Sequence, residues 1–518
     1  MKALAYKWQV MSVVIFGSFM VILDSTVVNV TVPTFEQVFK SDVNGVQWIL
    51  TSYLLALGII TPVAGYLADN FGIKRMYLLS LGLFVLGSAL CGFSQSLPML
   101  VIFRVLQGLG GGATVPLGTA QLFSAFPPEE RGLANGIFGV PLLVAPALGP
   151  TLGGYIVQYF HWSLIFYINV PIGLAGIGMG LWLLHSDETH KSRKFDYAGF
   201  GLAAAGLGLL LYALSEVSNQ GWGDPLILTL FGVSLVFLIT FAVVELRRED
   251  AIVDLRLYKQ HVFTLGSIVY WVMTIALFGT AFLLPLYLQN IRGKSPFETG
   301  LLLLPQAVAA AVTVPFTGRL FDKVGPRALV TFGIILLAGS SWFFTQISPT
   351  SDILTIEILL AVRGLALGFA LQSTFTTALS VVERRALPRG SSLVNASRQV
   401  FQALGIAVLS TILTTQTTAY MNAARGQNIS PQQAGSEAFV SGLNDAFNMV
   451  FWMTVAGVIL SIFLPGWPGK WPLKKPDEKA YKPGEAGKSP SKTPESSEQP
   501  GSPVIPPSKP GIETGKSS

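Results

Sequence analysis

The chain has 518 residues, of which 51% are hydrophobic and 12% are charged, whereas about a quarter of the residues in a typical soluble domain are charged. This composition excludes an ordinary soluble protein and indicates a chain that lies largely in a membrane. The single cysteine, Cys91, excludes a disulfide framework and any metal site built from several cysteines.

Apolar stretches long enough to cross about 30 Å of hydrocarbon follow one another along the chain, separated by short breaks. In chain order, we expect fourteen spans at residues 8–33, 46–68, 75–95, 98–123, 132–157, 162–184, 195–217, 225–246, 262–290, 297–318, 327–347, 351–381, 391–415 and 444–467. The first stretch lacks a small-residue cleavage site, so we expect a retained span and not a signal peptide. The sequence therefore predicts an all-α polytopic membrane protein with fourteen transmembrane helices.

Lysine and arginine lie mainly in one set of alternating loops. With the N-terminus inside, eighteen of them fall on the cytoplasmic side of the spans and four on the other side. Because cytoplasmic loops carry an excess of basic residues, this bias predicts a cytoplasmic or inner-membrane protein with both termini in the cytoplasm. The net charge of +6 then reflects inner loops and a basic tail that face anionic lipid, and it does not indicate a nucleic-acid partner.

An internal repeat divides the chain into two halves. The segment GYLADNFG at 65–72 recurs as GRLFDKVG at 318–325, with Gly, Leu, Asp and Gly each displaced by 253 residues. Similarly, Arg131-Gly132 opens the fifth span and Arg389-Gly390 opens the thirteenth. Such repeats are typical of secondary transporters, whose substrate site lies between the halves. We expect six-helix bundles at 1–190 and 251–467, two inserted helices at 191–250, and a disordered cytoplasmic tail, rich in Pro, Lys, Ser and Glu, at 468–518.

Several segments, taken together and in this order, carry a family resemblance. They are LDSTVVNV at 23–30, the loop at 65–75, RVLQG at 104–108, ALGPTLGG at 147–154, YLQ at 287–289, the segment 295–305 and RQ at 398–399. From about Met11 to Leu464 the chain resembles the fourteen-helix drug:proton antiporter branch of the major facilitator superfamily. One departure is Gly325-Pro326-Arg327, which stands where the first copy of the repeated loop has Gly72-Ile73-Lys74-Arg75.

The resemblance implies multidrug efflux, as in antibiotic resistance, driven by a proton gradient and without a cofactor. The expected partners are protons, the lipid bilayer and a small hydrophobic or cationic substrate. The sequence does not indicate whether a periplasmic adaptor also takes part. Export of one endogenous metabolite, lipid or siderophore is the alternative within the class. An uptake symporter is disfavoured because importers usually lack the motif at 147–154. An enzyme is disfavoured because no catalytic constellation lies in a pocket.

Charged residues inside the membrane are the strongest candidates for function, because each is costly unless it is paired or hydrated. Asp24 and Arg104 both lie roughly 9 Å below the outer surface, at 1.5 Å per residue. They could form an ion pair in which Arg104 keeps Asp24 ionised until a proton or a cationic drug competes. The alternative is a pair that only locks the first and fourth spans together. Secondary charged candidates, for which interior polar contacts are the alternative, are Glu216, Glu357, Arg363 and Arg398.

Gating is expected at two motifs. One is the inner loop with Gly65, Asp69, Gly72 and Arg75, in which Asp69 could accept hydrogen bonds from the start of the thirteenth span around 390–392 and latch the cytoplasmic side. An ordinary helix cap is the alternative. The other motif is in the fifth span, where the resemblance implies contact with the second half, and its residues are Gly149, Pro150, Gly153 and Gly154.

Substrate-lining candidates are polar or aromatic residues of the spans, whose side chains suit planar or cationic compounds. They are Asn29, Trp48, Tyr53, Gln107, Phe278, Gln289 and Gln372. Each of these residues could equally be packing or part of an interfacial belt. No phosphate-binding loop with the required glycines is found, so the energy for transport is expected to come from an ion gradient.

Overall fold

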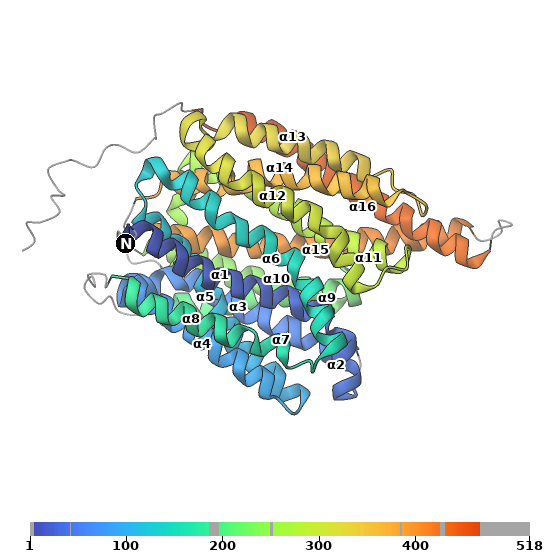
Figure 1. Cartoon of the computed structure of the whole chain (residues 1–518), viewed down its shortest axis with the longest axis horizontal. Helices are drawn as coiled ribbons and strands as arrows, with labels where there is room; N and C mark the ends of the chain where they lie inside the picture. Colours follow the sequence, from blue (N-terminus) through green and yellow to red (C-terminus); the bar gives the residue numbers. More distant parts are fainter. Residues whose placement is uncertain are drawn as a thin grey trace, which may run out of the picture. The chain divides into compact units, whose positions relative to one another are not determined.

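The computed structural model describes residues 5–41, 43–185, 196–248, 252–383, 386–424 and 430–466. Within these residues the chain is built of helices and contains no strand. Figure 1 shows that the long helices run side by side and in alternating directions. We call the side on which α1 begins the N-terminal side and the opposite side the far side. The tail at 468–518, for which we expected disorder, lies outside the described residues.

The first bundle contains six long helices and two short ones. The long helices are α1 (Tyr6–Val30), α3 (Val43–Phe71), α4 (Ile73–Phe93), α5 (Leu97–Ala125), α6 (Arg131–Tyr159) and α8 (Asn169–Leu183), and the short ones are α2 (Val32–Phe39) and α7 (Leu164–Tyr167). Apolar side chains of α1, α3, α4 and α5 form its core. A single turn, η1 (Pro128–Glu130), leads into α6, and the ion pair between Lys7 and Glu130 (2.5 Å) ties this turn to the start of α1.

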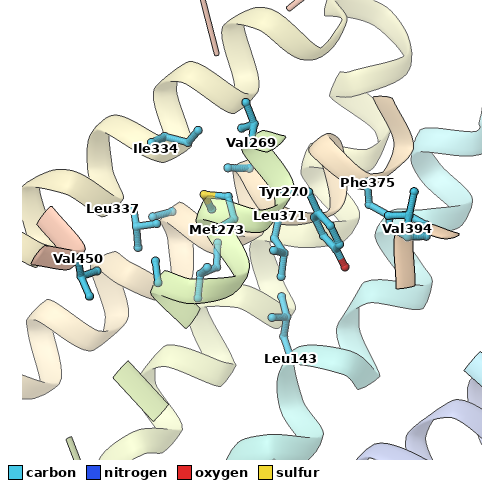
Figure 2. Close-up of a cluster of buried hydrophobic side chains, with 14 of the residues drawn as sticks. Leu143, Val269, Tyr270, Met273, Ile334, Leu337, Leu371, Phe375, Val394 and Val450 are labelled. Atoms are coloured by element: carbon cyan, nitrogen blue, oxygen red, sulfur yellow. The ribbon is translucent and has the colours of Figure 1, made fainter. Parts of the chain in front are cut away.

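The second bundle repeats this arrangement. Its helices are α11 (His261–Asn290), α12 (Pro296–Val324), α13 (Pro326–Phe344), α14 (Ile353–Ser380), α15 (Leu387–Ala424) and α16 (Pro431–Ile462), preceded by the turn η2 (Leu255–Lys259). Figure 2 shows part of its core, where Leu143 of α6 lies beside Leu371 of α14. The apolar core of the second bundle thus continues into a helix of the first.

The prediction of fourteen spans is confirmed. Thirteen of the described helices are long and apolar enough to cross a membrane, and α6 supplies one more as a bent pair, Pro128–Pro146 and Thr151–Tyr159, at an angle of 42°. The bend falls where prolines interrupt the helix, and proline lacks the N–H that would continue the hydrogen-bond ladder. Two six-helix halves with two inserted central helices, the fold class expected from the sequence, therefore describe the molecule.

The predicted limits of the last two spans were wrong. We expected spans at 391–415 and 444–467, whereas α15 runs from Leu387 to Ala424 and α16 from Pro431 to Ile462. At 1.5 Å per residue α15 is about 57 Å long, which exceeds the hydrocarbon thickness. Its far-side turns are polar, so the apolar pattern does not reveal them. Contacts between the two helices stabilise these turns, including the hydrogen bond from Tyr420 to Asp445 (3.1 Å).

The inserted helices α9 (Tyr197–Gln220) and α10 (Pro225–Arg247) form a hairpin against both bundles. The ring of Tyr212 in α9 stacks on Trp48 of α3 at 5.6 Å. On the other side, Trp222 donates a hydrogen bond to Thr411 of α15 (2.8 Å). Helix α9 therefore lies along α3 and α15 at once, whereas α10 exposes many apolar side chains, as a helix facing lipid does.

Candidate functional site

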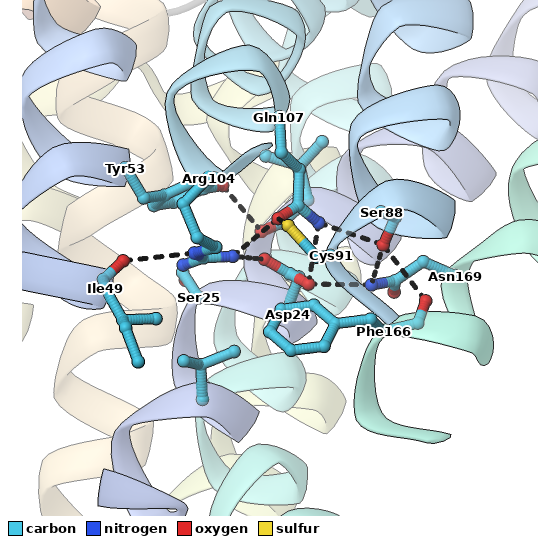
Figure 3. Close-up of polar contacts among 12 residues, drawn as sticks. Asp24, Ser25, Ile49, Tyr53, Ser88, Cys91, Arg104, Gln107, Phe166 and Asn169 are labelled. Carbon is cyan, nitrogen blue, oxygen red and sulfur yellow. Dashed lines mark hydrogen bonds and ion pairs between the residues drawn. The ribbon is translucent and has the colours of Figure 1, made fainter. Parts of the chain in front are cut away.

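Asp24 of α1 and Arg104 of α5 form an ion pair in the interior of the first bundle (Figure 3). Arg104 Nη1 donates to Asp24 Oδ2 at 2.7 Å, and both side chains are at most 1% exposed. The guanidinium also donates through Nε to the carbonyl of Ile49 (3.2 Å) and lies 4.0 Å from the ring centre of Tyr53. The contact that the two matching depths suggested is therefore present, whereas its role in proton coupling stays a prediction.

Amide side chains complete the surroundings of the Asp24 carboxylate. Its Oδ1 accepts hydrogen bonds from Gln107 Nε2 (2.9 Å) and Asn169 Nδ2 (2.7 Å). Both amides also donate to Ser88 Oγ, at 2.9 and 3.0 Å. Ser88 in turn donates to the Phe166 carbonyl (3.0 Å). Because hydrogen bonds to a charged acceptor are the stronger ones, this network fixes the position of the carboxylate.

Sequence position explains part of this network. Gln107 follows Arg104 by three residues, so both lie on one face of α5, where Gln107 Oε1 accepts from Arg104 Nη1 (2.7 Å). Asn169 stands at the start of α8 and Ser88 lies in α4, and neither was among the residues expected at the site. The signal for Asn169 was an amide side chain at the start of an otherwise apolar span, where an unpaired polar group is costly.

The buried pair constrains the chemistry of the site. Removing one partner of a buried ion pair typically costs about 3–5 kcal/mol, because the other charge is left uncompensated. Arg104 Nη2 is buried and has no hydrogen-bond partner, so the guanidinium has no other described counter-charge than Asp24. Protonation of Asp24 would therefore leave Arg104 unbalanced.

The seven substrate-lining candidates do not converge on one place. Tyr53 and Gln107 are buried in the Arg104 surroundings. Trp48 is 42% exposed and lies against α9, while Gln289 is exposed at the far end of α11. Phe278 is half-buried in α11, and the side chain of Asn29 lies outside the described residues. Gln372 borders a small cavity between α6, α12 and α14.

The repeated loop reaches the opposite bundle in both of its copies. Asp69, at the end of α3, forms an ion pair with Arg389 of α15 (2.5 Å), and Gly65 packs so closely that a Cβ there would lie 2.5 Å from the Pro388 carbonyl oxygen. Asp69 thus contacts the start of α15, as expected, but through the side chain of an arginine that was not expected as its partner. Arg75 is exposed on α4.

The second copy makes the helix-terminus contact that was expected of the first. Asp322 of α12 accepts hydrogen bonds from the backbone N–H groups of Gly132 (2.9 Å) and Leu133 (3.0 Å), which begin α6. The partial positive charge at a helix N-terminus favours a carboxylate there. The second copy of the loop differs from the first at Gly325-Pro326-Arg327, and the Asp322 contact is present despite this difference. In both copies the last glycine, Gly72 or Gly325, has positive φ (88° and 83°), which ends one helix before the next begins.

The fifth-span motif contacts the second half, as expected, since a Cβ at Gly300 of α12 would overlap Thr151 Oγ1, but it also packs against its own bundle. A Cβ at Gly149 would overlap Thr26 Oγ1, and one at Gly153 would lie 2.9 Å from the Val27 carbonyl oxygen, so both glycines face α1 of the same bundle. Of the four residues, Gly154 faces the second bundle, where a Cβ would lie 3.7 Å from Phe297. The side chain of Pro150 lies outside the described residues.

The secondary charged candidates are scattered. Glu216 is half-buried near the far end of α9, and Glu357 is half-buried one turn into α14. Arg398 is half-buried in α15, with its Nε enclosed and without a hydrogen-bond partner. Arg363 is wholly buried in α14 and donates to Ser341 Oγ (2.9 Å) and to the Ala276 carbonyl (2.6 Å).

Two repeated six-helix bundles with charged residues buried among their spans define the class of the protein as a multi-pass membrane transporter. Solved structures share this fold. The human organic anion transporter MFSD10 aligns with a TM-score of 0.60 at 14% identity, covering 86% of this chain and 99% of that one. The proton:xylose symporter XylE aligns with a TM-score of 0.59 at 14% identity, covering 90% and 97%. At such low identity the likeness shows the fold alone.

The chain belongs to the Major Facilitator Superfamily, whose family model matches residues 14–408. Curated relatives include the lincomycin resistance protein LmrB of Listeria monocytogenes, 32% identical over 87% of this chain and 95% of that one. The multidrug export protein EmrB of Escherichia coli is 31% identical over 88% and 94%. These comparisons confirm the expected family, and they identify a transporter and not an enzyme.

Proposed function

We propose that this chain is a proton-coupled antiporter that exports hydrophobic or cationic drugs by alternating access. The observation that carries the proposal is the buried Asp24, the carboxylate of the Arg104 ion pair. An antiporter requires a site that proton and substrate occupy in alternation. A buried carboxylate with one counter-charge meets this requirement, because protonation and a competing cation both change the balance of the pair. The drug-export names of LmrB and EmrB support the substrate class.

The proposed cycle depends on the contacts between the bundles. The inter-bundle contacts of Asp69 and Asp322 lie at the N-terminal side, together with the hydrogen bonds from Asn135 Nδ2 to the Gln372 carbonyl (2.9 Å) and to Thr376 Oγ1 (2.8 Å). In the proposed cycle these contacts hold that side shut. Rearrangement of the Asp24 network on protonation is transmitted through α1 and α5, and the two bundles then part on the N-terminal side to admit substrate.

We place the N-terminal side in the cytoplasm, in the inner membrane of the cell, on the basis of the bias of basic residues. In a Cys91→Ser background, a single cysteine at Lys323 on the N-terminal side and one at Gln433 on the far side should react with a membrane-impermeant maleimide from opposite faces. In intact cells the reagent should label Gln433→Cys, and in inverted vesicles Lys323→Cys. Labelling of both from one face would contradict this orientation.

Loss of the Asp69 latch should slow transport. The Asp69–Arg389 pair is partly exposed, so its removal is worth up to about 1 kcal/mol, or roughly fivefold in an equilibrium between closed and open states. Asp69→Asn is therefore expected to lower turnover several-fold while the Kd for tetraphenylphosphonium stays unchanged. Asp445→Asn, on the far side, serves as the control. Normal turnover of Asp69→Asn in proteoliposomes would refute the latch, and loss of binding would show that the residue has another role.

Asp24→Asn tests the proton-coupling proposal. In proteoliposomes with an imposed pH gradient, addition of tetraphenylphosphonium should release protons through the wild-type protein, and Asp24→Asn should abolish this flux because an amide cannot exchange a proton. The variant should still bind the drug and exchange it down its own gradient. Glu437→Gln, which alters an exposed carboxylate at the start of α16, should behave as wild type. Full drug-driven proton flux in Asp24→Asn would remove Asp24 as the carrier.

A further inference from the structure

The second bundle contains a buried arginine that lacks an acidic partner. Arg363 of α14 is 0% exposed, and its hydrogen bonds go to neutral acceptors, the Ser341 hydroxyl and the Ala276 carbonyl. Its Nε is enclosed and has no hydrogen-bond partner. Among the described residues no carboxylate lies within ion-pair distance of its guanidinium. Arg363 ends the third turn of α14, about 15 Å from the far end of that helix at 1.5 Å per residue.

The internal repeat shows what is missing around Arg363. A displacement of 253 residues, the offset of the repeated loop, relates Ser88 to Ser341 and Asp24 to Leu277, which follows Ala276. Arg104 and Arg363 are 259 residues apart, and each lies in the fourth long helix of its bundle. Arg104 and Arg363 both donate to groups on the first helix of their own bundle, and both bundles place a serine of the third span in the network.

The residues that stand in the second bundle in place of Asp24 and Gln107 are apolar. Three residues after Arg104 stands Gln107, whereas three residues after Arg363 stands Ala366. Ala366 and Ala276 are both buried. The second bundle thus retains the arginine and the serine of the arrangement, while apolar side chains replace the groups that balance the arginine.

An unbalanced buried cation requires compensation. Neutral oxygen acceptors satisfy some of its N–H groups but do not cancel its charge, and a charged side chain at this depth is costly without a counter-charge. The fork of donors in a guanidinium fits a carboxylate in a two-point contact. We propose that Arg363 binds the anionic group of a transported compound, so that the substrates include hydrophobic carboxylates as well as neutral and cationic drugs. This inference rests on the proposed export function and specifies its substrate class.

Helix α14 also borders the other bundle, through a different face from the one that carries Arg363. Nine and thirteen residues beyond Arg363, Gln372 and Thr376 of the same helix accept hydrogen bonds from Asn135 of α6 in the other bundle. Nearer to Arg363, Gly364 packs so closely against α12 that a Cβ there would overlap the Gln306 carbonyl oxygen. In this conformation the guanidinium is enclosed where α14 meets α11 and α13, so a ligand reaches it when α14 turns or parts from these two helices during the transport cycle.

A pair of probes that differ in charge alone tests the assignment. The full chain in nanodiscs is titrated with 1-pyrenebutyrate and with its neutral amide, using pyrene fluorescence and no pH gradient. The wild-type protein should bind the carboxylate more tightly than the amide. Arg363→Gln should weaken carboxylate binding about tenfold or more, as expected for the loss of a charge-assisted two-point contact, and leave amide binding unchanged. Arg363→Lys keeps the charge but not the forked donor geometry, so its affinity for the carboxylate should lie between those of the wild type and Arg363→Gln.

The controls separate this role from a structural one. Arg292→Gln removes the same charge from a loop of the same bundle and should leave the ratio of the two Kd values unchanged. Retained amide binding shows that a variant is folded. If Arg363→Gln binds neither ligand, the proposal is tested with Arg363→Lys instead. A ratio of carboxylate Kd to amide Kd in Arg363→Lys that equals the wild-type ratio overturns the proposal. Equal binding of both probes by the wild type, or no binding of the carboxylate, also overturns it.

Competition distinguishes an organic substrate from an inorganic anion. If millimolar sodium chloride displaces 1-pyrenebutyrate from the wild type, the site belongs to chloride and the substrate assignment is wrong. Because these are binding measurements without a gradient, they do not depend on proton coupling. A transporter that fails the Asp24 test could still bind carboxylates at Arg363, so failure of one proposal is distinguishable from failure of the other.

Discussion

The ion pair between Asp24 and Arg104 is the interaction on which the first bundle depends most. Both charges are out of contact with solvent, and each is balanced mainly by the other. Helices α1, α3, α4, α5 and α8 all contribute groups to the surrounding network. A change in the charge of either side chain therefore alters a network to which five helices contribute. In the proposed mechanism, this is how one proton alters the packing of rigid helices.

The two bundles have the same architecture but different electrostatics. Each carries a buried arginine in its fourth long helix, yet Asp24 balances Arg104 whereas Arg363 is bonded to neutral oxygens. The contacts between the bundles on the N-terminal side are also only approximately symmetric. Asp69 forms an ion pair with an arginine side chain, whereas Asp322 accepts hydrogen bonds from the N-terminus of α6. Two halves with the same fold can therefore have different chemical roles. We propose that the first bundle binds the proton and that the second binds an anionic group of the substrate.

Much of the architecture could be predicted from the sequence. The succession of long apolar stretches, the basic residues in alternating loops and the repeated GYLADNFG segment each limit the possible arrangements of helices. The matching depths of Asp24 and Arg104 also predicted their contact correctly. Partners that carry no charge, such as Asn169 and Ser88, could not be found in this way, because their role depends on which helices pack together. The far-side turns of α15 were missed since their residues are polar, and helix pairing stabilises them where hydrophobicity does not. The direction in which Gly149 and Gly153 face depends on the rotation of α6, which the small-residue spacing does not determine.

The protonation of Asp24 can be observed directly by infrared difference spectroscopy of the reconstituted protein during exchange of drug for proton. If Asp24 carries the proton, release of the drug should produce a carbonyl stretching band of a protonated carboxyl group. Isotope labelling of aspartate should shift this band, and Asp24→Asn should remove it. A drug-dependent carboxyl band that persists in Asp24→Asn, or the absence of any such band in a wild-type protein that transports, would contradict proton coupling at Asp24.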